Sequence, residues 1–391
     1  MNCPLIELRA VVEVSTGSRN PTKFPDQNFV YVDVAGVDNK TKQISGARTL
    51  IGADAPSRAR KVIRSGDVLV STVRPNLNAV AVVPESLDGQ VASTGFCVLR
   101  ATPRVLPEYL FNFVRSQTFV DNLNQLVAGA LYPAVTDGQV LDQKLPVPAV
   151  AEQRRIVDLL SRAEGIVRLR REAQQKAAEL VPAIFIDMFG DPATNPSGWP
   201  KSLFGEVGTL DRGKSRHRPR DAAALYGGSY PFIQTGDVAN SGGRIRHYLA
   251  AYSEAGLAQS RLWRAGTLCI TIAANIAKTG VLEFDSCFPD SVVGFIPGNR
   301  VRVGFVQAWL GFLQPTLEAN APQAAQKNIN LEILRALPIP VPPTVLQDVF
   351  IERCERVISV QRQQQDATAA AQAAFSALLA RSFNHRIEEA A

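Results

Sequence analysis

The stretch PAVAEQRRIVDLLSRAEGIVRLRREAQQKAAELVPAIFIDMF, residues 148–189, decides the architecture of the chain. Its apolar residues follow the 4-3-4 spacing of a helix that packs along a narrow seam, beginning with Ile156, Leu160, Ala163 and Val167. At a rise of about 1.5 Å per residue, such a helix is roughly 60 Å long. We therefore expect a long helical rod in the middle of the chain.

Prolines mark both ends of this rod. The entry is LPVPAV (145–150), which cannot begin a helix before its second proline. Asp191-Pro192 and the loop ATNPSGWP (193–200) end it. Pro182 lies inside the rod and predicts a kink, or an early end to the regular helix.

The second half of the chain repeats the first. Pro146-Val147-Pro148 recurs at 340–342, and the same offset of 194 places Gln153 on Gln347. The segment SGDVLVST (65–72) matches AGTLCITI (265–272) at an offset of 200, a drift that loop insertions explain. Repeats in solenoids are only about 20–50 residues long, so this repeat predicts a duplicated two-part module with an internal pseudo-two-fold axis.

A second rod therefore follows the second block, at 344–383. Its seam includes Phe350, Cys354 and Phe375, and it is interrupted at Gln364 and Thr368. The first rod is interrupted at the equivalent Arg170 and Gln174. Matched seams predict that the two rods pack against each other as an antiparallel coiled coil. The alternative is that each rod packs on its own block.

The segments before each rod mix strands and helices. In the first block, the runs 29–34, 67–73, 79–83 and 96–99 are rich in β-branched and aromatic residues and are separated by turns. One amphipathic helix is expected over 107–127, with Leu110, Phe113, Val114 and Gln117 on one face. The fold class is thus α+β, with two α/β blocks and two long helices. The expected boundaries are 1–145 and 193–336 for the blocks, 146–192 for the central helix, and 337–391 for the C-terminal helix and tail.

Composition narrows the function classes. The net charge of +6 is compatible with a polyanionic partner. The five cysteines are scattered without a CxxC pair, and the three histidines have no ligand partners at metal-binding spacing, so neither a disulfide framework nor a metal site is expected. The N-terminus has no signal pattern, and no apolar run is long enough to cross a membrane. We expect a soluble, cytoplasmic protein with no membrane contact.

One motif suggests a different class. Residues 208–215 satisfy the P-loop pattern GxxxxGK[ST], with Lys214 as the phosphate-binding lysine of a P-loop NTPase that carries a coiled-coil arm. The strand expected before this loop is short and half-polar, and Pro219 falls where the following helix should begin. No nucleophilic triad or nuclease cluster is visible either. We therefore expect no catalytic residues and no cofactor.

Basic and amide residues gather in the turns between strands, where they can bind phosphates and base edges of DNA. The loops just before the two proline-rich entries contribute further candidates, which are Tyr132 in the first block and Gln326 and Lys327 in the second. The alternative for any one of these residues is an ordinary solvated surface. The candidates in the turns are Lys42, Arg48, Arg74, Asn76 and Asn78 in the first block, and Arg212, Lys214, Arg216, Arg218, Asn275 and Lys278 in the second.

The order of these features resembles the specificity subunit of Type I restriction–modification systems. The resemblance covers nearly the whole chain and rests on LPVPAVAEQRRIV, its echo PIPVPPTVLQDVF, the exit AIFIDMFGDP, GDVLVSTVRPN and the RGKS turn at 212–215. It implies that the blocks are target recognition domains, each reading half of a split, asymmetric site in double-stranded DNA. It also implies that the rods set the gap between half-sites and dock two modification subunits, which methylate adenine using S-adenosylmethionine.

The resemblance further implies two restriction subunits that translocate and cleave DNA with ATP, so this chain would itself be non-catalytic. The second copy departs from the pattern, because Leu346 stands where Glu152 precedes the glutamine and Asn384 stands in place of Gly190. Docking on the C-terminal rod is therefore less firmly implied. A coiled-coil scaffold with no nucleic-acid partner remains a further alternative.

Overall fold

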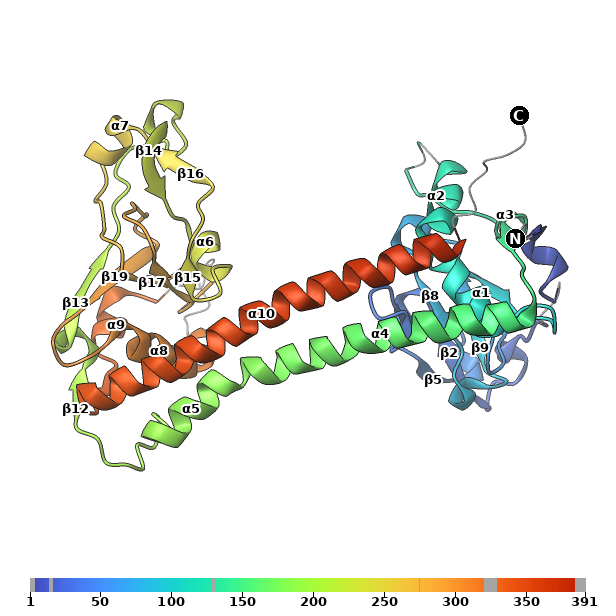
Figure 1. The fold of residues 1–391 in the computed structure, drawn as a ribbon, viewed down its shortest axis with the longest axis horizontal. Coiled ribbons are helices and arrows are strands. Elements are labelled where there is room, and N and C mark those ends of the chain that lie inside the picture. Colours follow the sequence, from blue (N-terminus) through green and yellow to red (C-terminus); the bar gives the residue numbers. More distant parts are fainter. Residues whose placement is uncertain are drawn as a thin grey trace. The chain divides into compact units, whose positions relative to one another are not determined.

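The computed structural model of the chain divides into two compact units (Figure 1). Unit 1 is Met1–Arg171 with Asp366–Ala391, and unit 2 is Glu172–Gln365. Each unit holds one globular block together with the adjacent parts of both long helices. The structure describes residues 4–13, 17–127, 129, 131–273, 275–319 and 329–383.

The two long helices each have residues in both units, and the other elements belong to one unit. The long helices are α4 (Val150–Ala178) and α10 (Thr344–Phe383). Unit 1 contains β1 (Leu5–Glu7), β2 (Asn28–Val32), β3 (Val37–Asp38), β4 (Gln43–Ile44), β5 (Arg48–Ile51), β6 (Ala59–Val62), β7 (Val68–Ser71), β8 (Val80–Val82), β9 (Val91–Ser93), β10 (Phe96–Leu99), α1 (Pro107–Val114), α2 (Gln117–Gln125), α3 (Asp137–Leu141) and β11 (Lys144–Pro146). Unit 2 contains α5 (Leu180–Phe189), β12 (Lys201–Leu203), β13 (Gly208–Arg212), β14 (Tyr226–Phe232), α6 (Thr235–Ala239), β15 (Arg244–Ile245), β16 (Ala250–Tyr252), α7 (Glu254–Ala258), β17 (Leu268–Thr271), β18 (Thr279–Leu282), β19 (Val292–Pro297), α8 (Val303–Ala319), α9 (Leu331–Arg335) and β20 (Pro338–Pro340).

Strand β7 is the centre of unit 1 because both of its faces are buried. It pairs antiparallel with β10 and β8 in a three-stranded sheet, and a separate four-stranded sheet has the order β5-β2-β9-β6. Side chains alternate between the faces of a strand. Val68 and Val70 accordingly join the core around α1, while Leu69 joins the core that includes Val32 and Ala92 of the four-stranded sheet.

Unit 2 has the same plan around β17. This strand lies inside a five-stranded sheet of order β13-β19-β17-β18-β15. Leu268 and Ile270 join the core that contains α8, whereas Cys269 faces the opposite core around Trp263. The matched strands β7 and β17 therefore do the same structural work in the two halves.

Each block is closed by a short strand pair at the entry of its long helix. In unit 1, β1 pairs antiparallel with β11, and in unit 2, β12 pairs antiparallel with β20. The backbone amide of Val147 donates to the carbonyl of Pro4, and that of Val341 donates to Pro200 in the equivalent way. The first strand of each block is thus tied to the residues that lead into the helix.

A buried glutamine then fixes each helix to its block. Gln153 is fully buried; its Oε1 accepts from the amide of Leu106 at 2.9 Å, and its Nε2 donates to the carbonyls of Arg104 and Pro148. Gln347 is equally buried and makes the equivalent set. Its partners are the amide of Arg302 at 2.7 Å and the carbonyls of Arg300 and Pro342.

In unit 1, the beginning of α4 and the end of α10 pack against the block and against each other. Leu160 and Val167 of α4 share one core with Phe375 and Phe383 of α10. Arg115, at the end of α1, forms two hydrogen bonds with Glu164 of α4, and its guanidinium lies over the rings of Phe111 and Phe375. Arg115 has only 6% of its side chain exposed, whereas Glu164 is 49% exposed, so the ion pair is shielded from solvent on the arginine side only.

In unit 2, aromatic rings take the place of that ion pair. Phe185 and Phe189 of α5 contact Phe350 of α10 and Phe305 of α8, with ring centroids 5.0–5.6 Å apart. The helix is interrupted at Glu179, one turn before Pro182, whose missing N–H leaves a carbonyl unpaired. Nearby, Gln361 of α10 donates to the carbonyl of Ala177 at 2.6 Å.

The structure confirms the long helices and the break before Pro182. It also confirms the antiparallel pairing, because residues of increasing number along α10 contact residues of decreasing number along α4 and α5. Both packing alternatives hold in part, since the helices also pack on the blocks. The single helix expected over 107–127 is wrong. It is two helices, because Ser116 caps α2 by accepting from the amide of Phe119, and Gln117 is exposed.

We predict that Gln153→Leu lowers the stability of unit 1 by about 2–3 kcal/mol. The substitution leaves one amide and two carbonyls without their partner in a buried site. For a unit of this size, the loss corresponds to a fall in Tm of about 4–12 °C. Thermal unfolding of the purified chain measures it. Arg154→Leu, at the exposed neighbouring position, is the control and should unfold within about 2 °C of wild type. If the Gln153→Leu chain is as stable as wild type, the buried glutamine is not a clamp that fixes the helix to its block.

Candidate nucleic-acid interface

The turn between β7 and β8 presents polar side chains on a constrained backbone. Arg74 and Asn78 both adopt left-handed φ angles, 50° and 46°, on either side of the 3-10 turn Pro75–Leu77. Such angles are unfavourable for an arginine and tolerated by asparagine. Arg74 and Asn76 are exposed. The side-chain amide of Asn78 instead donates to the carbonyl of Val114 at 3.3 Å.

Lys42 stabilises this turn through a hydrogen bond. Its Nζ donates to the carbonyl of Asn78 at 2.5 Å. Burial, with a smaller contribution from the charge of Arg115, lowers the pKa of Lys42 to about 8. The ammonium group of Lys42 is therefore bonded to the turn and is not available as a surface cation.

The loop that contains Tyr132 lies against the same turn. The amide of Arg74 donates to the carbonyl of Pro133 at 2.8 Å, and Val73 forms an antiparallel bridge with Ala134. Leu131 and Tyr132 are 88% and 77% exposed. The structure thus brings together two stretches that the sequence offered as separate candidates.

In unit 2, the segment after β13 forms a basic loop whose residues alternate in exposure. Gly213 and Ser215 are buried, whereas Lys214 and Arg216 are exposed. A Cβ at Gly213 would lie 2.2 Å from the carbonyl oxygen of Phe288, so only glycine fits there. The hydroxyl group of Ser215 faces that of Tyr252 at 3.4 Å.

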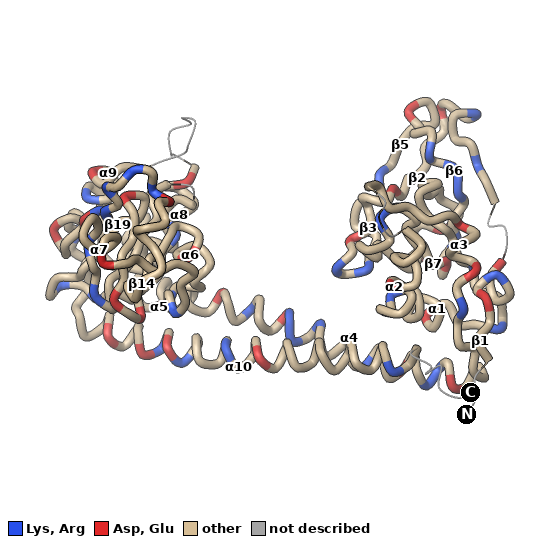
Figure 2. The backbone as a smooth tube through the Cα atoms, turned by 90° about the horizontal axis from the view of Figure 1, so that it is seen from above, with Lys and Arg blue, Asp and Glu red and all other residues tan. Residues whose placement is uncertain are grey.

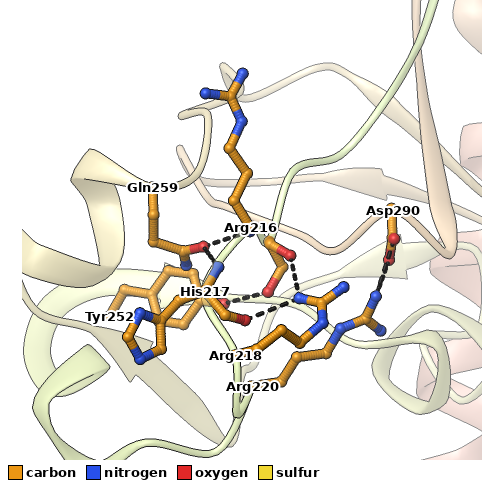
Figure 3. Close-up of polar contacts among 8 residues, drawn as sticks. Arg216, His217, Arg218, Arg220, Tyr252, Gln259 and Asp290 are labelled. Atoms are coloured by element: carbon orange, nitrogen blue, oxygen red, sulfur yellow. Dashed lines mark hydrogen bonds and ion pairs between the residues drawn. The ribbon is translucent and has the colours of Figure 1, made fainter.

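Residues from other elements hold the backbone of this loop. Oε1 of Gln259, just after α7, accepts from the consecutive amides of Arg216 and His217 at 2.5 and 3.0 Å (Figure 3). The hydroxyl of Ser260 donates to the carbonyl of Lys214 at 2.7 Å. The loop conformation is therefore set before any ligand binds.

The arginines of the loop divide into two kinds. Arg218 turns back and donates to the carbonyls of Ser215 and His217, and Arg220 pairs with both carboxylate oxygens of Asp290 (Figure 3). Arg216 extends away from these contacts (Figure 3). Lys214, Arg216 and His217 are exposed, as are Arg218 and Arg220, but the guanidinium groups of the last two are bonded to the loop and to Asp290.

The turn between β17 and β18 leaves the same end of the five-stranded sheet. The amides of Gly213 and Ile272 donate to neighbouring carbonyls, those of Val292 and Ser291, at the start of β19. Asn275 and Lys278 are exposed on this turn, and the amide of Lys278 donates to the hydroxyl of Thr271 at 3.0 Å. The basic loop and this turn thus belong to one end of the sheet.

The P-loop pattern at 208–215 does not have P-loop geometry. Gly208 to Arg212 is strand β13, paired with β19 along its length, and no helix follows over residues 213–218. Among the described residues, no group of acidic, histidine or cysteine side chains is placed to hold a metal ion. No described helix is long and apolar enough to span a membrane.

Comparison with known proteins places this architecture in a family. The family model "Type I restriction modification DNA specificity domain" matches the chain twice, at residues 7–179 and 196–366. The chain belongs to this family. The two matches also confirm the internal repeat, because each specificity domain contains one block and most of the long-helix sequence that follows it.

Individual relatives agree with this assignment. A solved chain titled "Structural basis underlying complex assembly and conformational transition of the type I R-M system" is 30% identical, with 98% of this chain and 99% of that chain covered and a TM-score of 0.70. The S subunit of a Type-I system from M. genitalium, 12% identical over 98% of this chain and 97% of its own, has the same fold with a TM-score of 0.53. The HindI specificity subunit from Haemophilus influenzae is 28% identical over 35% of this chain. The chain spans 31–46% of the length of the curated relatives it matches.

Within the specificity domains, the predicted residues fall into separate settings. Arg74, Asn76 and Tyr132 share one surface of the first domain, and Arg48 lies on strand β5 over the ring of Tyr31. Lys42, Asn78 and Arg218 bond to their own unit. The loop that begins at Arg212 and Lys214 and the turn of Asn275 and Lys278 leave the same end of the second sheet, and Arg216 follows on that loop. Gln326 and Lys327 lie outside the described residues.

The residues that position these side chains lie far from them in the sequence. Gln259 is 43 positions from Arg216, and Asp290 is 70 positions from Arg220. His217, which is exposed on the same loop, is not among the residues predicted from the sequence. No local pattern predicts such partners, because the contacts form only when the block is folded.

We predict that Gln259→Met, which removes the acceptor at similar size, weakens DNA binding about tenfold, as Arg216→Ala does. Because Gln259 acts by placing the backbone of Arg216, the double variant should lose little more than either single variant. Anisotropy of labelled duplex DNA with the full chain measures all three. Gln307→Met, which removes an amide bonded to Gly243, is the control and should bind as wild type. Additive losses, or wild-type binding by Gln259→Met, would refute the positioning role.

Proposed function

We propose that this chain is the non-catalytic DNA-recognition subunit of a Type I restriction–modification complex. Each unit reads one half of a bipartite, asymmetric site in double-stranded DNA. The proposal rests on one observation. The same framework of strands and turns occurs in both units, but its exposed side chains differ. The β7–β8 turn offers Arg74 and Asn76, and the equivalent β17–β18 turn offers Asn275 and Lys278.

The exposed side chains have the chemistry that DNA recognition needs. Arginine and lysine bind phosphates, while arginine and asparagine also read base edges in the major groove. Lys and Arg are distributed over both units (Figure 2). In unit 2, Gln259 accepts from the backbone amides of Arg216 and His217, so the loop backbone is already held and its ordering cost on binding is reduced.

The long helices set the spacing between the half-sites and dock two modification subunits. The matched clamps of Gln153 and Gln347 support this role, because they join a long helix to each reading unit in the same manner. Both helices keep charged faces, such as Arg162 and Glu352, on which partner subunits can dock. The modification subunits contribute S-adenosylmethionine-dependent methylation of adenine, and two restriction subunits contribute ATP-driven translocation and cleavage.

The chain itself contributes recognition and assembly. It holds no cofactor of its own in this proposal, and its place of action is the cytoplasm, where the DNA and the partner subunits are. An NTPase with a coiled-coil arm is not supported, because the segment of Lys214 lacks the strand–loop–helix geometry that cradles phosphates.

We predict that deleting the gene removes one split adenine-methylated motif from the methylome of its host and leaves all other motifs intact. Expression of the intact chain should restore that motif. Long-read sequencing that detects methylated adenine measures it directly. A methylome that is the same with and without the gene would contradict the proposed function.

A further inference from the structure

Four large apolar side chains are exposed on the Arg74 turn of unit 1 and on the loop that is bonded to it. Leu131 and Tyr132 are the most exposed large apolar side chains described in this unit, at 88% and 77%. Leu77, on the turn itself, is 45% exposed, and Val73 is 36% exposed. Soluble proteins scatter single apolar residues over their surfaces, but a contiguous group of them marks a binding site.

Backbone hydrogen bonds join the parts of this surface. The amide of Arg74 donates to the carbonyl of Pro133, directly after Tyr132, and the amide of Val135 donates to the carbonyl of Thr72. The residues directly after Leu131 and Tyr132 are therefore attached to the turn by an isolated antiparallel bridge between Val73 and Ala134. This bridge holds the loop tip of Leu131 and Tyr132 next to the turn of Arg74 and Asn76.

The turn is also held in a conformation that the chain would not adopt freely. Arg74 has a left-handed φ of 50°, which is unfavourable for an L-residue other than glycine. Lys42 secures the far end of the turn through the carbonyl of Asn78. Strain of this kind persists at binding sites where the surrounding structure over-determines it.

We propose that Leu131 and Tyr132 form an apolar wedge that inserts at a base step of the DNA half-site read by unit 1, with Arg74 on a flanking phosphate. This inference rests on the proposed function and adds a second way in which unit 1 would recognise a DNA sequence. A wedge unstacks and kinks the duplex, so it discriminates sequences by their deformability as well as by their base edges. The flexible pyrimidine–purine steps are the ones that it favours.

Size and chemistry favour DNA over a protein partner as the occupant. A stable protein interface takes about 20–30 residues on each side, and this tip offers a few apolar residues interleaved with Arg74 and Asn76. One aromatic and one aliphatic side chain at a projecting tip match what architectural DNA-binding proteins insert between base pairs. The adjacent guanidinium supplies the phosphate contact that holds a wedge in place.

The test uses the full chain in complex with its modification subunits and a duplex that contains the motif found by methylome sequencing. Dyes at the two ends of the duplex report bending by energy transfer. Tyr132→Ser and Leu131→Ser should each weaken binding about tenfold and straighten the DNA, because base–aromatic stacking and apolar contact are lost. The slope of log affinity against log salt should stay unchanged.

Arg74→Ala provides the contrast, because loss of one phosphate contact should reduce that salt slope by about 1. Leu5→Ser, at a half-exposed leucine on β1, should bind and bend DNA as wild type. Wild-type bending by both tip variants would overturn the wedge. So would tip variants that no longer assemble with the modification subunits in size-exclusion chromatography, since the tip would then be a protein contact. If the wild-type complex shows no preference for the motif duplex, the proposed function itself fails.

Discussion

The orientation of each long helix depends on one buried amide. Gln153 and Gln347 each join the helix to the residues before α1 or α8 and to the proline-rich entry, with three hydrogen bonds and no solvent contact. An amide is the side chain that can accept and donate at once in such a site. The closing strand pairs and the central strands β7 and β17 also correspond, but the contacts that hold the two long helices together differ between the units. Arg115 fastens the helices in unit 1, whereas phenylalanine rings do so in unit 2. The shared clamp therefore leaves the rest of each block free to diverge.

Most of the architecture could be predicted from periodicity and from the repeat. The seam through Leu160 and Val167, the break before Pro182 and the strands around Val68–Ser71 all follow from local patterns that the folded chain keeps. The two helices in place of one over 107–127 could not be predicted in this way, because the cap at Ser116 competes with a continuous apolar stripe. The division into two units, each with parts of both long helices, could not be predicted from the sequence either, because it depends on which helix segment contacts which block.

The sequence marked candidate segments but not the setting of their side chains. The basic and amide residues lie in turns that the repeat shows to be equivalent. Which of these cations bond within their own unit depends on the folded structure. Arg218 bonds to carbonyls of its own loop, and Lys42 bonds to the turn that ends at Asn78. Gln259, which sets the loop of Arg216, has no sequence pattern of its own. Side-chain direction is a tertiary property, and composition alone does not contain it.

The central claim is that each block carries its own half of the recognition sequence on a shared framework. The most direct measurement is the methylated motif produced by a chimera in which residues 1–145 are replaced by the corresponding block of a relative with Gln153 and its helix kept intact. The account predicts that one half of the motif changes and that the other half and the spacing stay the same. A chimera that alters both halves, or one that folds and assembles yet methylates the original motif, would contradict it.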